Sequence, residues 1–224
     1  MTLAANQPYF LPYFPYWQLI HAADRFLVAD DYAFIRHGWI TRNRIRMGER
    51  EIYLLVELQQ MSRNKLISQL ELAPLQVDKK LRTVETAYHK APFFQQGYEL
   101  FQRILSCPEK NLALFLEASI REVCTYLGIE TPIGRTSSLE GNVLLKKEER
   151  IYDFCHRLES DHYINAIGGR ELYSCEEFRR QGICLNFLQS HAQAAGTLSV
   201  LDAIMNHSRE ELHTLLDQYT LLDG

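Results

Sequence analysis

The first 31 residues, MTLAANQPYFLPYFPYWQLIHAADRFLVADD, decide the fold class of this 224-residue chain. Residues 1–5 are short and apolar, which favours a buried strand, and residues 25–29 form a second compact apolar run of the same kind. Between them, the spacing of Trp17, Ile20 and Ala23 predicts a helix over residues 16–23. The order strand, loop, helix, strand is typical of a mainly parallel sheet covered by helices.

The rest of the chain continues this alternation. Further strands are predicted over residues 51–58, 66–72, 162–167 and 183–188, with a loop or short strand over 133–138. Helices are predicted over residues 77–88, 93–105, 111–127, 146–158, 198–205 and 210–219. Ser174 with Glu177 and Ser208 with Glu211 have the spacing of a capping box, so helices should begin after both serines.

We therefore predict an α/β fold, a mainly parallel, Rossmann-like sheet with helices on both faces and a helical C-terminal part. Residues 1–224 should form a single compact domain, strand-rich over 1–75 and helix-rich over 76–224. Ligands of such sheets collect beyond the carboxyl ends of the strands. Three segments fit this rule, namely residues 7–16, 30–46 and 165–173.

Composition excludes several classes. With 24 basic and 28 acidic side chains, the formal charge is −4, which argues against a broad nucleic-acid-binding surface. No apolar run approaches the roughly 20 residues that span a bilayer, and residues 1–6 lack an export signal, so we expect no membrane insertion and a cytoplasmic location. The five cysteines form no C-x-x-C pair and the eight histidines no H-E-x-x-H, so no metal is predicted, and no motif identifies a cofactor.

An aromatic corner is the first candidate binding element. Six of the ten residues 8–17 are aromatic and three are proline, so the segment is rigid. Beside the polar Gln7, aromatic faces such as Tyr9 could stack a base or a sugar ring. The alternative is a packed corner that closes the sheet.

Two charged segments follow. Asp30 and Asp31 come directly after the strand predicted over 25–29, where a carboxylate could bind a cation or take a proton from an attacking amine, or Asp31 could simply turn the loop. Five arginines lie between residues 36 and 50, and Arg42 and Arg44 flank Asn43, with Trp39 nearby. Guanidinium groups match phosphate oxygens, so this cluster favours a pyrophosphate site over a merely solvated face.

Weaker signals come from two junctions. Lys90 lies where two predicted helices meet and could contact an anion, although a plain helix-to-helix turn explains it equally well. Gly168 and Gly169 permit close backbone approach to a ligand, or only a turn with positive φ.

Several segments together resemble the WbqC-like protein family, in the same order and over essentially the whole chain. They are QPYFLPY (7–13), residues 23–31, GWITRNRI (38–45), YHKAPF (88–93), DHYIN (161–165) with Gly168 and Gly169, then Tyr173, Phe178, residues 182–183 and LSVLD (198–202). The resemblance implies a role in bacterial O-antigen or other surface-polysaccharide biosynthesis, as a glycine-type or aminoacyl transferase acting on an amino sugar. It also brings Asn165 and Tyr173 into the candidate site. Pro15 and Thr41 depart from the family's usual Gly and Asn.

The leading hypothesis is an acyl or aminoacyl transferase that modifies a nucleotide-linked amino sugar. Arg42 and Arg44 would hold the diphosphate, Tyr9 and Trp39 would stack on the base or sugar, and Asp31 would deprotonate the amine. The rival is a noncatalytic nucleotide-sugar-binding or scaffold protein of the same pathway. A third hypothesis is nucleotidyl transfer, although the two histidines typical of such enzymes are absent between residues 7 and 17. Association into a homo-oligomer stays open.

Overall fold

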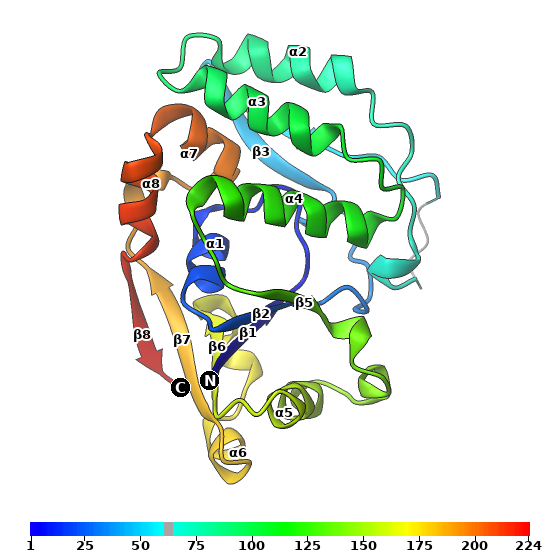
Figure 1. The fold of residues 1–224 in the computed structure, drawn as a ribbon, viewed down its shortest axis with the longest axis vertical. Coiled ribbons are helices and arrows are strands. Elements are labelled where there is room, and N and C mark those ends of the chain that lie inside the picture. Colours follow the sequence, from blue (N-terminus) through cyan, green and yellow to red (C-terminus); the bar gives the residue numbers. More distant parts are fainter. Residues whose placement is uncertain (61–64) are drawn as a thin grey trace.

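The computed structural model describes residues 1–60 and 65–224. A six-stranded sheet with the order β5-β2-β1-β6-β7-β8 runs through it. The strands are β1 (Thr2–Asn6), β2 (Arg25–Val28), β5 (Ile133–Arg135), β6 (His162–Ala166), β7 (Cys184–Ser190) and β8 (Tyr219–Asp223). All neighbours pair in parallel except β8, which runs antiparallel to β7 at one edge (Figure 1). The predicted α/β class with a mainly parallel sheet is confirmed.

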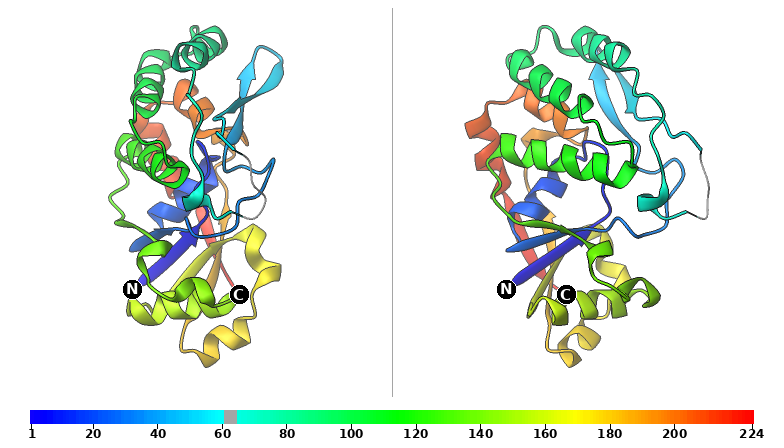
Figure 2. Two further views of the ribbon diagram at one scale, coloured as in Figure 1. Left: turned by 90° about the vertical axis from the view of Figure 1, so that its right-hand side faces the viewer. Right: turned by 45° about the vertical axis from the view of Figure 1, so that its right-hand side comes forward.

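Helices cover both faces of the sheet, because alternate residues of each strand are apolar on opposite sides. In β1, Leu3 and Ala5 belong to a core shared with α5 (Glu148–Arg157) and α6 (Cys175–Arg180). Ala4 instead joins a larger core shared with α1 (Phe14–His21), α4 (Leu112–Leu127) and α8 (Arg209–Leu216). Figure 2 shows these helices on the two sides of the sheet. The predicted helices on both faces are therefore present.

A second group of elements extends the larger core away from the sheet. It contains α2 (Val77–Tyr88), α3 (Phe94–Leu105), α7 (Val200–Asn206) and the antiparallel hairpin of β3 (Arg42–Met47) and β4 (Arg50–Leu55). Tyr88 joins three of them, since its hydroxyl donates to Asp202 Oδ1 at 2.6 Å and accepts from the Arg46 amide at 3.0 Å. The short 3-10 helices are η1 (Ile67–Gln69), η2 (Thr136–Ser138), η3 (Asn142–Leu144), η4 (Ile167–Leu172) and η5 (Gln193–Ala195).

The best-predicted helices carry recognisable end signals. Asn111 caps α4, its side chain accepting from the backbone amides of Ala113 and Leu114, and Gly128 ends the helix with φ of +74°. The capping box of Ser208 and Glu211 begins α8, as its spacing predicts. No helix in the described ranges is long and apolar enough to cross a membrane.

Two sequence-based assignments are corrected, and one segment without an assignment contains a strand. Residues 66–72 do not form a strand, because the Gln69 side chain accepts from the Leu66 amide and folds the segment into η1. The arginine-rich segment contains β3, whose alternation of arginine with Asn43 and Ile45 places one face in the core. The helix predicted over 210–219 ends at Leu216, and the next residues pair with β7 as β8.

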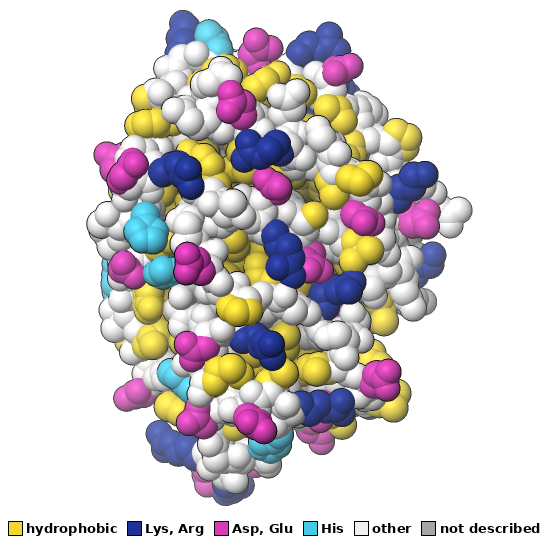
Figure 3. Space-filling model, in the orientation of Figure 1, with side chains coloured by type: hydrophobic (Ala, Val, Ile, Leu, Met, Phe, Trp, Pro, Cys, Tyr) yellow, Lys and Arg dark blue, Asp and Glu magenta, His cyan; other side chains and the backbone are white. Residues whose placement is uncertain are grey.

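Surface charge is mixed where it is visible. Figure 3 shows arginine and lysine side chains interspersed with acidic ones over α3, α4 and the sheet edge. Ion pairs account for part of this pattern, such as Arg103 with Glu122 at 3.1 Å and Arg121 with Glu117 at 2.8 Å. This face therefore presents no continuous basic surface.

Replacing Asn111 by alanine should lower the free energy of unfolding by about 1–2 kcal/mol, because α4 loses its cap. The Asn111 amide also donates to the Ser68 carbonyl at 2.7 Å, so the same change loosens η1. Urea denaturation measures the loss. Asn206→Ala, at an exposed position of α7, serves as the control and should change stability by no more than about 0.5 kcal/mol; equal losses would contradict the capping role.

Candidate functional site

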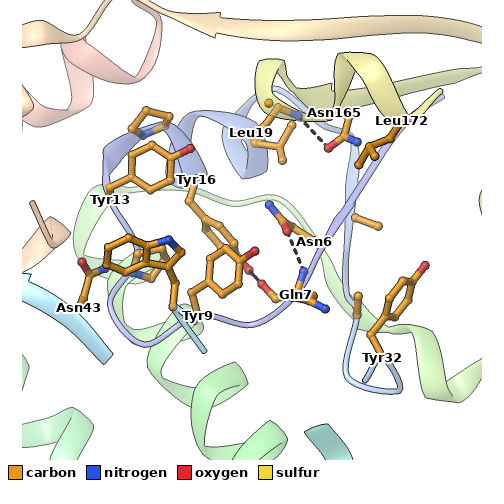
Figure 4. A pocket seen from close by; sticks show the side chains of 18 of the residues that line it. Asn6, Gln7, Tyr9, Tyr13, Tyr16, Leu19, Tyr32, Asn43, Asn165 and Leu172 are labelled. Atoms are coloured by element: carbon orange, nitrogen blue, oxygen red, sulfur yellow. Dashed lines mark hydrogen bonds between the residues drawn. The ribbon is translucent and has the colours of Figure 1, made fainter. Parts of the chain in front are cut away.

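A cavity of about 620 Å³ lies over the carboxyl ends of β1 and β6. From β1 the chain crosses to β2 on one side, whereas from β6 it continues to β7 on the other. Connections that diverge in this way leave a crevice at the sheet edge, the usual ligand position in open α/β sheets. Figure 4 shows the side chains that line it.

An aromatic wall closes one side of the cavity. It consists of Tyr9, Tyr13 and Tyr16 from the proline-rich segment and α1, together with Trp39. The segment is held by its own hydrogen bonds. They run from Trp17 Nε1 to the Pro12 carbonyl (3.0 Å), Tyr16 Oη to the Gln7 carbonyl (3.0 Å), Asn43 Nδ2 to the Leu11 carbonyl (2.7 Å) and the Phe10 amide to the Ile40 carbonyl (3.1 Å). The wall is therefore formed before any ligand arrives.

Carboxamide groups border the cavity at the strand ends. Asn6 closes β1 and accepts the amide of Gln7 at 2.8 Å, and Asn165 near the end of β6 accepts the amide of Ala166 at 2.8 Å. Both, and Gln7, line the cavity. Gly168 and Gly169 follow in η4 and also line it. A Cβ atom on residue 169 would lie 2.6 Å from Asn165 Nδ2, so glycine is required there for Asn165 to keep its position.

Arg44 is the charged side chain among the lining residues. Its Nη1 donates to Glu51 at 2.8 Å, and its guanidinium carbon lies 5.6 Å from the centre of the Trp39 ring. Arg42 lies on the same face of β3 but outside the lining, with its guanidinium carbon 4.5 Å from the centre of the Tyr53 ring. The Nε atoms of both arginines are buried and have no hydrogen-bond partner within the described residues.

The twin aspartates lie outside the cavity lining. Asp31 is 6% exposed and accepts from Arg150 Nη2 at 2.7 Å and from Thr136 Oγ1 at 2.5 Å. Asp30 is 1% exposed and accepts from the amide and hydroxyl of Ser137 at 3.0 and 2.7 Å. These bonds join the end of β2 to η2 and α5. The predicted catalytic role of the pair gains no geometric support from this placement.

Asp31 reaches the cavity indirectly, through Arg150. The Arg150 guanidinium carbon lies 4.1 Å from the centre of the Tyr32 ring, and Tyr32 lines the cavity. The ion pair therefore positions Tyr32, an aromatic side chain that lines the cavity outside the aromatic wall. Lys90, exposed in the turn between α2 and α3, lies outside the lining.

The phenols of the cavity are neutral at neutral pH. Burial raises the pKa of Tyr173 to about 12, opposed in part by the neighbouring Asn165 and Tyr163 side chains. Burial likewise raises the pKa of Tyr9, Tyr13 and Tyr32 above the usual value. Each can donate a hydrogen bond, and none is suited to act as a base at pH 7.

Some lining residues escaped the sequence analysis. They are mainly Asn6, Tyr32, Tyr163 and Leu172. Asn6 had a usable signal, because the first polar residue after a predicted buried strand lies at the ligand-binding edge. Tyr32 had none, since its place beside the cavity depends on Arg150, 118 positions further along the chain.

The fold and the cavity define a Rossmann-like α/β protein with a cavity at the point where its strand order reverses. The model of the WbqC-like protein family matches residues 7–214, and the chain belongs to this family. It is similar to an uncharacterised protein of Mycobacterium tuberculosis, with 24% identity over 224 aligned residues that cover 93% of this chain and 94% of that protein. No solved structure matches the chain significantly. Within residues 1–60 and 65–224, no cluster of three or more His, Cys, Asp or Glu side chains could hold a metal ion.

Asp31→Asn and Arg150→Met should each lower the free energy of unfolding by about 3–5 kcal/mol, because each leaves one buried partner of the ion pair uncompensated. The double variant should lose much less than the sum of the two, since neither charge is then left alone. Urea denaturation of the four proteins checks this cycle. Additive losses would show that the two side chains do not stabilise the fold as a pair.

Proposed function

We propose that this protein binds a nucleotide-linked sugar in the cavity over β1 and β6 and serves surface-polysaccharide biosynthesis. The observation that carries the proposal is the gathering of a rigid aromatic wall, a guanidinium group and carboxamides around one cavity. Most of the site residues proposed from sequence contribute to this lining. They are Gln7, Tyr9, Trp39, Asn43, Arg44, Asn165, Gly168, Gly169 and Tyr173. Family membership supports the biosynthetic context.

Each part of the lining suits one part of such a ligand. The faces of Tyr9 and Trp39 can stack on a base or a sugar without ordering many torsions. Arg44 can contact the diphosphate, because it lines the cavity and its cation lies over Trp39. The cavity volume falls within the range of small-molecule sites, roughly 300–1,000 Å³.

Acyl or aminoacyl transfer to the amino group of a nucleotide-linked amino sugar is the second candidate function. In this reaction the amine nitrogen bonds to the acyl carbon, the leaving group departs and the amine loses a proton. The phenol and carboxamide donors favour it, because such groups can stabilise the oxyanion formed at the acyl carbon. The bonds of Asp31 to Arg150 and Thr136 favour a positioning role for this residue over that of the proton acceptor.

Binding of a UDP-linked amino sugar should change the intrinsic fluorescence of Trp39. This residue lines the cavity and is 43% exposed, whereas the chain's other tryptophan, Trp17, is fully buried. Trp39→Phe should abolish the change, and Tyr9→Ala should weaken binding about 2- to 10-fold through lost stacking. Tyr53→Ala, an exposed aromatic outside the lining, is the control. Titrations without any signal, confirmed by calorimetry with a panel of nucleotide sugars, would contradict the proposal.

Mass spectrometry of UDP-linked amino sugars incubated with activated acyl donors tests the transferase candidate. The expected product is an N-acylated sugar formed only with the protein present. Asp31→Asn should keep turnover per folded molecule within a few-fold of wild type, since a general base contributes about 10²- to 10⁴-fold. A loss in that larger range, with the fold intact, would make Asp31 the base. Saturable binding of the sugar without turnover for any donor would contradict transferase activity and favour a noncatalytic binding protein.

A further inference from the structure

The orientation of two carboxamides in the cavity is decided by their backbone partners. A backbone N–H can only donate, so the atom of Asn6 that meets the Gln7 amide, and the atom of Asn165 that meets the Ala166 amide, must be oxygen. The nitrogen of Asn6 is then left for other contacts, and the nitrogen of Asn165 lies beside Gly169 and the Tyr173 side chain. In Figure 4 the Asn6 nitrogen points away from Gln7 into the cavity, and the Asn165 nitrogen lies on the side of Leu172.

The two asparagines border the same stretch of sheet edge. Ala4 of β1 pairs with Ile164 of β6, so Asn165 stands one position beyond that pair and Asn6 two. Because side chains at successive register positions point to opposite faces of a sheet, Asn6 and Asn165 reach the edge from opposite faces, on strands about 5 Å apart.

No lining side chain carries a negative charge at neutral pH. The lining contains no aspartate or glutamate. The Tyr173 phenol keeps its proton, because burial raises its pKa to about 12. An anionic ligand group therefore meets no like charge in the lining.

From this arrangement we infer that the ligand group over the carboxyl ends of β1 and β6 is an oxyanion, a carboxylate or a phosphoryl group, held by the side-chain nitrogens of Asn6 and Asn165. The inference rests on the proposed function and extends it. Arg44, the charged side chain of the lining, is then available for a second anionic group. An ammonium group is disfavoured over β1 and β6, since the lining offers it no carboxylate.

Isosteric substitution tests the inference. Asn6→Asp and Asn165→Asp keep the oxygen that accepts the backbone amide, but replace the donor by an ionised carboxylate at pH 7. A lost hydrogen bond to a charged group should weaken oxyanion binding by about 10-fold or more. Asn206→Asp on exposed α7, whose amide donates only to the Asp202 carbonyl, is the matched control.

Two readouts separate the possible sources of the oxyanion. In ¹⁵N-labelled protein, the side-chain NH₂ signals of Asn6 and Asn165 should shift saturably with inorganic phosphate or with glucuronate, and that of Asn206 should not. Calorimetry then compares UDP-glucuronate with UDP-glucose, which differ by a carboxylate. A preference for UDP-glucuronate that both Asp variants lose identifies a carboxylate. Equal loss of UDP and both UDP-sugars identifies a phosphoryl group.

The outcomes also separate this inference from the proposed function. If UDP-sugars bind wild type and both Asp variants equally well, the oxyanion site is wrong and nucleotide-sugar binding stands. If no UDP-sugar binds but phosphate or glucuronate still shifts both amides, the oxyanion site stands and the proposed function fails. Absence of every shift, with all variants folded, overturns the inference.

Discussion

The pairing of β1 with parallel neighbours on both sides is the constraint on which the rest of the structure depends. β2 lies on one side of this strand and β6 on the other, and the chain leaves the two sides in opposite directions. Because the crossover helices diverge there, side chains do not fill the sheet edge above β1 and β6. Asn6 and Asn165 come to this edge from segments about 160 residues apart in sequence.

Rigidity of the cavity comes from two buried polar arrangements. On one side, the side chains of Trp17 and Asn43 donate hydrogen bonds to backbone carbonyls of the proline-rich segment. These bonds fix the aromatic rings in position in the absence of a ligand. On the other, the Asp31–Arg150 pair lies under Tyr32. Buried ion pairs contribute little net stability, yet they strongly penalise the loss of one partner. The pair therefore holds the Tyr32 ring in one orientation. Less side-chain entropy is then lost when a ligand binds.

The sequence predicted the fold class well because its local signals agree with one another. The amphipathic stripe between Asn111 and Gly128 and the capping box at Ser208 are signals within a few residues, and the structure keeps both. Predictions failed where a side-chain hydrogen bond or a distant partner overrode the local pattern. The segment beginning at Leu66 alternates like a strand, but a Gln69 side-chain hydrogen bond turns it into a 3-10 helix. The last strand, β8, forms only because β7 offers an edge.

For the candidate site, sequence alone determined the chemistry available and tertiary structure decided its use. Residue types and the rule that ligands lie beyond strand ends pointed to Gln7, Tyr9 and Arg44, all of which line the cavity. The same rule pointed to Asp31, but its carboxylate turns to a guanidinium group supplied by α5. A buried charge must be paired with an opposite charge, and the packing of distant segments determines which partner lies within reach. The periodicity of the sequence therefore determines the position of a side chain on its strand or helix, and tertiary packing determines which groups that side chain contacts.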